Sequence, residues 1–113
     1  MKIDSYTFGK IFIDGKNYDS DVILYKNTVY PNWWRMSGHL LQIDDIKKHL
    51  TKNPKKLIIG AGFYQRMKVD PETKSYLKKA DIDVVIESTS NAWKTFNSLS
   101  EKEDVMAAFH LTC

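Results

Sequence analysis

The first thirty residues alternate short apolar runs with turn signals, a pattern that is typical of a meander of β-strands. Two aromatic and β-branched runs flank Gly9, and Asp14-Gly15 then gives a strong hairpin signal. A third run, DVILY, covers residues 21–25, and a shorter one, VYP, covers residues 29–31. We therefore expect the chain to begin with several short strands joined by tight turns.

The spacing of apolar residues becomes helical in the segment 39–50, HLLQIDDIKKHL. Positions three and four apart along the chain are occupied by Ile43, Ile46 and Leu50. Either Asp44 or Asp45 can cap the N-terminus of such a helix. Pro54 predicts that the helix ends shortly before it.

From residue 56 onward, apolar runs alternate with helical segments. The runs KLIIG, residues 56–60, and IDVVIES, residues 82–88, predict two buried strands. Between them, Asp70-Pro71-Glu72 combines a capping acid, a proline in the first turn and a further acid, which is a helix start.

The last quarter of the chain predicts one more helix and one more strand. Residues 89–99, TSNAWKTFNSL, have helical spacing, with Ser88, Thr89 or Ser90 as the cap. The closing segment DVMAAFHLTC is apolar on both faces, which favours a strand in the centre of a sheet. Strand, helix, strand, helix, strand is an α/β pattern, and its first unit should be a right-handed crossover between parallel strands.

Length and charge narrow the class of protein. We expect one domain spanning residues 1–113, since 113 residues is a common domain size. The 17 Lys+Arg and 14 Asp+Glu give a net charge of only +3, and the lysines are scattered as short pairs, so we expect no nucleic-acid binding. No apolar run approaches the roughly 20 residues that cross a bilayer. The first ten residues lack the apolar core of a signal peptide, and we expect a cytoplasmic protein.

Five motifs in order resemble one small family over essentially the whole chain. They are FGKIFIDGKNYDSDVIL, WWRMSGH, LIIGAG followed by a methionine, N-x-L and FHLTC. This combination is similar to the Mth938-domain proteins, which include an adipogenesis-associated protein and a mitochondrial complex I assembly factor. The resemblance implies a three-layer α/β fold with a mixed central β-sheet, and it implies no reaction. The family often has a further glycine at the position of Gln65.

The sequence Gly60-Ala61-Gly62 raises the question of a phosphate-binding loop. A dinucleotide loop needs three glycines and a helix that begins at once, whereas here Gln65 takes the third position and the helix starts near Pro71. No Gly-Lys-Ser/Thr ending follows either. We therefore interpret Gly60 and Gly62 as turn glycines that permit positive φ.

A different anion site remains open at the carboxyl edge of the predicted sheet, where open α/β sheets bind ligands. The two loops at this edge supply the candidate residues: Gly60, Gly62, Tyr64, Arg66, Thr89, Ser90 and Asn91. Arginine suits an anion because its guanidinium is a bidentate fork, and only two of the 17 basic residues are arginine. The alternatives are that residues 88–90 only cap a helix and that Arg66 forms a structural ion pair, for instance with Glu87.

The motif NWWRMSGH supplies a candidate surface for a protein partner. Trp33 and Trp34 should face opposite ways in a strand, so that one lies in the core and the other is exposed. Exposed tryptophan beside Arg35 is typical of interaction hot spots, and His39 completes the candidate set. Arg35 stacked on tryptophan as a structural cation–π pair is the alternative.

His110 and Cys113 invite a metal or nucleophile reading that we do not favour. A metal site needs more ligands than these two residues, and a strand points positions 110 and 113 to opposite faces. We expect no metal, no cofactor and no catalytic residue. The sequence favours a protein-interaction or assembly factor with a protein partner or self-association; the alternative is a small anionic-ligand-binding protein or enzyme.

Overall fold

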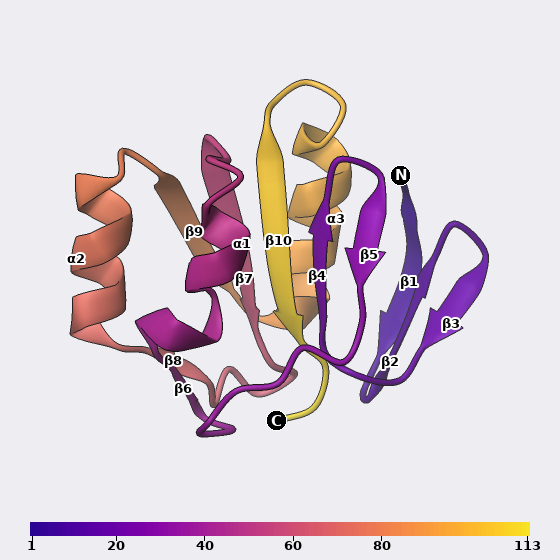
Figure 1. The fold of residues 1–113 in the computed structure, drawn as a ribbon. Helices are drawn as coiled ribbons and strands as arrows, with labels where there is room; N and C mark the ends of the chain where they lie inside the picture. The colour runs from indigo at the N-terminus through magenta and orange to yellow at the C-terminus, as the bar shows by residue number, and fades with distance from the viewer.

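The computed structural model describes residues 1–113 as three layers around a five-stranded mixed sheet (Figure 1). In spatial order the central strands are β5 (Thr28–Tyr30), β4 (Val22–Tyr25), β10 (Val105–His110), β7 (Lys56–Ala61) and β9 (Asp83–Glu87). β10 runs parallel to β7 and antiparallel to β4, and β7 runs parallel to β9. The expected α/β fold with a mixed central sheet is therefore confirmed.

The remaining elements cover the two faces of this sheet. One face carries a short parallel pair and three helices: β6 (Leu40–Leu41), β8 (Lys68–Val69), η1 (Ile43–Asp45), α1 (Lys47–Leu50) and α2 (Pro71–Lys79). The other face carries one helix and an antiparallel meander: α3 (Thr89–Leu99), β1 (Ile3–Thr7), β2 (Lys10–Ile13) and β3 (Lys16–Tyr18). The longest helix, α3, has 11 residues, and none of the helices is long and apolar enough to cross a membrane.

Strand β10 lies at the centre, as its two apolar faces predict, and all six of its residues are buried. Successive residues of β10 point to opposite faces, so Met106 and Ala108 join one core cluster while Ala107 and Phe109 join the other. The predicted helix starts are also confirmed: Asp70 caps α2 and Ser88 caps α3.

The helix predicted over residues 43–50 is only partly confirmed. The chain makes a single 3₁₀ turn and then one turn of α-helix, separated by Ile46 at φ −130°. The carboxylate of Asp45 accepts the backbone N–H groups of Gln42, at 2.8 Å, and of Met36, at 3.1 Å. Asp45 therefore joins this turn to the preceding loop, and the resulting geometry interrupts the helix.

Gly60 lies inside β7, and its φ is not positive, so our interpretation of it as a turn glycine is wrong. A Cβ atom at Gly60 would lie 2.7 Å from the ring of Phe109 and 2.8 Å from Oγ1 of Thr89. The missing side chain thus lets α3 approach the sheet closely. Gly62, in contrast, has φ +103° and fits the turn interpretation.

We expect Gly60→Ala to lower the free energy of unfolding by about 1–3 kcal/mol, because the added methyl group overpacks the contact between α3 and the sheet. Urea unfolding followed by tryptophan fluorescence measures the change. Gly38→Ala is the matched control, since a Cβ atom there meets nothing within 4 Å. Equal unfolding midpoints for the two variants would contradict the proposed close approach.

Candidate functional site

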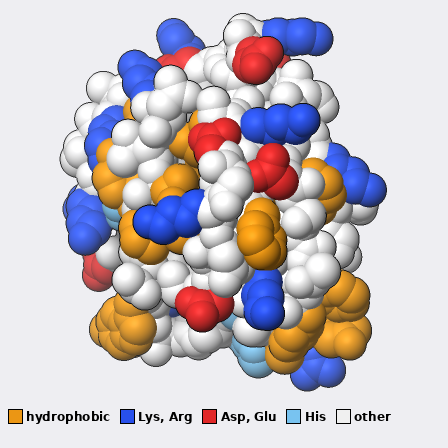
Figure 2. All heavy atoms as spheres, turned by 90° about the vertical axis from the view of Figure 1, so that its right-hand side faces the viewer, with side chains coloured by type: hydrophobic (Ala, Val, Ile, Leu, Met, Phe, Trp, Pro, Cys, Tyr) orange, Lys and Arg blue, Asp and Glu red, His pale blue; other side chains and the backbone are white.

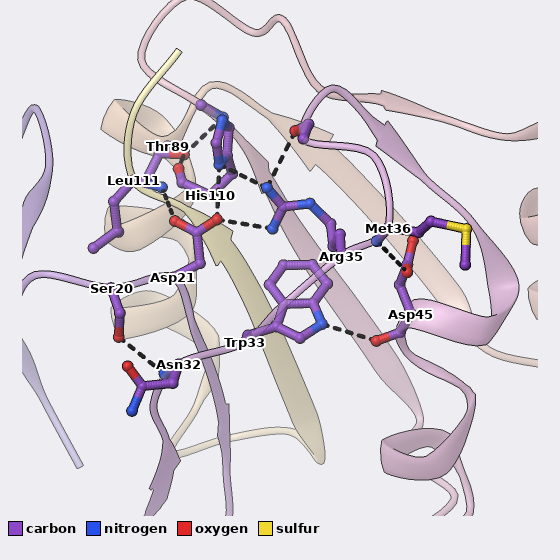
Figure 3. Close-up of polar contacts among 12 residues, drawn as sticks. Ser20, Asp21, Asn32, Trp33, Arg35, Met36, Asp45, Thr89, His110 and Leu111 are labelled. Atoms are coloured by element: carbon purple, nitrogen blue, oxygen red, sulfur yellow. Dashed lines mark hydrogen bonds and ion pairs between the residues drawn. The ribbon is translucent and has the colours of Figure 1, made fainter.

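A largely buried carboxylate, that of Asp21, joins three segments at the carboxyl edge of β7 and β10 (Figure 3). Asp21 directly precedes β4. Its Oδ1 accepts the backbone N–H of Leu111 at 2.7 Å, and its Oδ2 accepts Nη1 of Arg35 at 2.8 Å. Nδ1 of His110 lies 2.8 Å from the same Oδ2. The carboxylate thus holds the end of β10 and the segment 31–39 against the start of β4.

Arg35 lies inside the protein, with only 4% of its side chain exposed. Its Nη2 donates to the carbonyl of Gly38 at 3.1 Å, and its guanidinium carbon lies 4.7 Å from the centre of the Trp33 ring. The structure therefore shows the structural cation–π pair and an ion pair with Asp21. Any partner that contacts Trp34 would not reach the guanidinium of Arg35.

Nδ1 of His110 lies between two charged groups, the carboxylate of Asp21 and the guanidinium of Arg35. Burial by itself raises the pKa of Asp21, but hydrogen bonds from His110 and Leu111 and the pairing with Arg35 outweigh it, so the pKa lies below its usual range. An ionised carboxylate only accepts hydrogen bonds and a guanidinium only donates them. Nη2 of Arg35 lies 2.9 Å from the same Nδ1, so the contacts with Asp21 and Arg35 require opposite roles of that nitrogen. Nε2 of His110 is buried and has no partner.

An aspartate–histidine pair with a free Nε2 has the parts of a general base. However, none of the five main surface hollows is lined by Asp21, Arg35 or His110. The contacts of the pair hold the start of β4 and the end of β10 together.

The loop of residues 62–66, which we call the glycine loop, binds the carbonyl oxygens of Thr112 and Cys113. The N–H of Phe63 donates to the carbonyl of Thr112 at 2.7 Å, and the N–H groups of Tyr64 and Arg66 donate to the carbonyl of Cys113 at 3.3 and 3.0 Å. A Cβ atom at Gly62 would overlap with the backbone of Cys113. The backbone donors of this loop therefore bind oxygens of the chain itself.

Thr89 links this loop to α3 and to β10. Its Oγ1 accepts the N–H of Gly62 at 2.9 Å and donates to the carbonyl of His110 at 2.6 Å. Ser88 caps α3 by accepting the N–H of Asn91, which agrees with the capping alternative for residues 88–90. Among the other anion-site candidates, Ser90 is half-buried, and three residues are exposed: Tyr64, Arg66 and Asn91.

Trp33 and Trp34 separate as expected, although the segment 31–39 is not a strand. Trp33 is buried and donates its indole N–H to the carbonyl of Asp45 at 2.8 Å. Trp34 and Met36 point outward, each with 74% of its surface exposed. Two large apolar side chains are thus presented to solvent by a segment whose alternate residues are anchored inside.

A second apolar group lies at the same edge of the molecule. The ring centres of Phe8, Phe63 and Tyr64 lie 5.0–6.2 Å apart, and all three side chains are exposed. Figure 2 shows apolar side chains gathered on both sides of the lower edge. We call Trp34 and Met36, together with the rings of Phe8, Phe63 and Tyr64, the apolar edge.

The two candidate sites, which the sequence suggested separately, meet around His110. The ring of exposed His39 lies 6.3 Å from that of His110, and a Cβ at Gly62 would lie 2.9 Å from Cδ2 of His110. As site residues, sequence reasoning missed Asp21, the anchoring residue Asp45 and three exposed apolar side chains, those of Met36, Phe8 and Phe63. The sequence signals for Asp21 were its place at the start of an apolar run and its presence in the first of the five motifs.

The fold and this edge define a small three-layer α/β protein of the Mth938-like class. Residues 3–110 match the family described as a protein of unknown function (DUF498/DUF598), and the chain belongs to that family. The resemblance inferred from the motifs is confirmed.

Solved structures with the same fold include a conserved hypothetical protein from Pyrococcus horikoshii OT3. It is 29% identical, with a TM-score of 0.90 and coverage of 100% of both chains. The protein MT938 is 22% identical, with a TM-score of 0.80 over 99% of this chain and 98% of that one. A Mth938-like domain from Bordetella pertussis is 18% identical, with a TM-score of 0.69 over 97% and 85%.

We expect Asp21→Asn to lower the free energy of unfolding at pH 7 by about 3–5 kcal/mol, because it leaves the buried charge of Arg35 without its partner. The pKa of Asp21 is lowered in the folded protein. Its contribution is therefore complete above the unfolded pKa of about 4 and is lost as the pH falls through the folded pKa. The difference in the free energy of unfolding between wild type and Asp21→Asn should therefore become smaller below about pH 4.

Urea unfolding at pH 7, 4 and 3 measures both effects. Asp19→Asn is the matched control, because Asp19 is exposed and lies two positions away. If Asp21→Asn unfolds at the same midpoint as Asp19→Asn at every pH, the carboxylate does not hold the edge together.

Proposed function

We propose that this protein is an accessory factor that binds a protein partner through its apolar edge. The observation that carries this proposal is the exposure of Trp34 and Met36, 74% each, on a segment fixed by internal hydrogen bonds. A segment whose backbone is already held by hydrogen bonds loses little backbone entropy on binding. Tryptophan is also among the residues that dominate binding energy at interfaces.

A hollow beside Trp34 supports a partner that contributes an apolar side chain. It encloses about 560 Å³ and is lined by Tyr30, Trp34 and Met36, together with Asp44 and Lys48. Its rim carries charges of both signs, so the contact would rest on apolar burial rather than on net charge. A leucine, methionine or phenylalanine of the partner fits this chemistry, with the candidate His39 at the border of the contact.

The resemblance to Mth938-domain proteins supports the same role. Those relatives include a mitochondrial complex I assembly factor, and an assembly factor acts by holding a protein partner. In the proposed function Asp21, Arg35 and His110 shape the surface, and Trp34 and Met36 make the contact.

We expect Trp34→Ser to weaken partner binding by about 30-fold or more, the loss typical of a hot spot worth 2 kcal/mol. The partner would be identified by cross-linking in extracts of the source organism. Its affinity for the purified wild-type protein and variants would then be measured by calorimetry. Folding stability should change by less than about 0.5 kcal/mol, since the side chain is exposed.

Tyr76→Ser is the matched control, because Tyr76 is an exposed aromatic residue of α2. A partner that binds wild type, Trp34→Ser and Tyr76→Ser with equal affinity would contradict the proposal. Sedimentation of the wild-type protein alone tests self-association. If the wild type and Tyr76→Ser form a dimer and Trp34→Ser does not, the partner at the apolar edge is a second copy of this chain.

A second candidate function is the binding of a small anion at the glycine loop. The N–H groups of Tyr64 and Arg66 converge on one oxygen, that of Cys113, which is the geometry of an oxygen-binding loop. An anion would take the place of that carbonyl, with the exposed Arg66 guanidinium and the start of α3 at residues 89–91 beside it.

We expect an anion that binds here to shift the amide signals of residues 60–66 and 88–91, among them Gly60, Thr89, Ser90 and Asn91. A panel of phosphates, nucleotides and carboxylates would be screened by NMR. At a hundredfold excess over its Kd, a ligand should stabilise the protein by about 2.7 kcal/mol. Arg66→Ala should abolish these shifts, and removing residues 112 and 113 should strengthen them. The site would be rejected if no compound of the panel shifted these signals in the wild-type protein or in the protein that lacks residues 112 and 113.

A further inference from the structure

Strand β9 is an open edge of the central sheet. It pairs only with β7 and ends the spatial order of the five strands (Figure 1). Asp83 donates its N–H to Lys55 on the β7 side at 3.0 Å. Because backbone groups alternate along a strand, those of Val84 and Ile86 point away from β7, and no hydrogen bond satisfies them within the protein.

The surface beside this edge is apolar at its base and basic at its rim. Two adjoining hollows, of about 440 and 220 Å³, share Lys74 and Ile86. The side chains along them include Ile82, Val84, Met67 and Val69, and the lysines Lys68, Lys74 and Lys78. Lys74 and Lys78 are four positions apart on α2 and therefore lie on one face of that helix.

The charges around β9 favour an acidic occupant. None of Lys68, Lys74 and Lys78 forms an ion pair, and Asp83 is the only acid that lines the two hollows. An extended segment with acidic residues could therefore pair its backbone with Val84 and Ile86 and its carboxylates with these lysines.

A second copy of the chain fits this edge poorly in one antiparallel register. Antiparallel pairing of two β9 strands that joins Val84 to Ile86 places Asp83 opposite Glu87 of the other copy. Like charges directly opposite each other destabilise a strand pair. The same arrangement offers no acid to the lysines.

We propose that β9 binds an extended acidic segment of a partner protein as a sixth strand of the sheet. This surface is separate from the apolar edge, and the proposal does not depend on the function proposed above. Backbone pairing supplies affinity, while the apolar hollows and the lysines select side chains on one face of the docked strand.

The probe is the peptide ETVTVTE, with blocked ends, in which glutamate and valine alternate with threonine and share one face. Bound peptide should slow amide exchange of Val84 and Ile86 by roughly tenfold or more. Exchange of Val85, whose N–H already belongs to the ladder with β7, should change little. The peptide KTVTVTK is the charge control and should bind much more weakly.

Reversing two charges in the protein tests the same contact without altering the sheet. The double variant Lys74→Glu, Lys78→Glu should lose roughly tenfold or more in affinity for ETVTVTE. Lys79→Glu is the matched control, because Lys79 lies on the same helix but lines a different hollow. Trp34→Ser should bind the peptide as wild type does, which separates this outcome from that of the apolar edge.

Three results would overturn the proposal. One is that a large excess of ETVTVTE leaves the amide exchange rates of Val84 and Ile86 unchanged. Another is equal binding of KTVTVTK. The third is protection of these amides that grows with protein concentration without peptide, which would assign the edge to a second copy.

Discussion

The carboxylate of Asp21 is the constraint on which the geometry of this edge of the sheet depends. Burying a charge is unfavourable unless it is paired and hydrogen-bonded, so Asp21 can stay inside only while its donors remain in place. Those donors come from segments that are distant in sequence: Arg35 lies 14 residues away, and His110 lies 89 residues away. One ion thus fixes the start of β4, the loop before β6 and the end of β10 relative to one another.

The exposure of Trp34 follows from this constraint. Asp21 draws Arg35 inward, and Trp33 packs under its guanidinium while its indole N–H is bound by the chain at Asp45. Neighbouring side chains in an extended segment point in opposite directions, so anchoring 33 and 35 turns Trp34 and Met36 outward. The exposure of Trp34 and Met36 is therefore a consequence of buried polar contacts, and no strand is needed to produce it.

Local signals in the sequence predicted the fold, and long-range polar contacts limited the prediction of the site. The two apolar faces of residues 105–110 indicated the central strand, and the capping residues Asp70 and Ser88 indicated the starts of α2 and α3, because these signals act within a few residues. Nothing local marked Asp21 as a site residue, since its partners are distant in sequence. Arg35, an expected contact residue, is buried for the same reason.

The glycine loop was ambiguous because its defining feature is not its glycine pattern. Gln65 stands where related proteins often have glycine, and it adopts φ +55°, a left-handed conformation that costs roughly 1–2 kcal/mol for such a residue. Its neighbours offset this cost, since Tyr64 and Arg66 both donate to Cys113. The loop is held in shape by the oxygens that it binds, so losing one glycine leaves it intact.

The pairing of Asp21 with Arg35 also distinguishes this aspartate–histidine pair from a catalytic one. In a catalytic pair the carboxylate stabilises positive charge that builds up on the ring while Nε2 takes a proton from substrate. Here Oδ2 of Asp21 shares its charge with Arg35, and Nε2 of His110 is buried away from every main surface hollow. The contacts of Asp21 with Arg35, His110 and Leu111 hold three segments of the chain in place, and these segments include the one that exposes Trp34 and Met36.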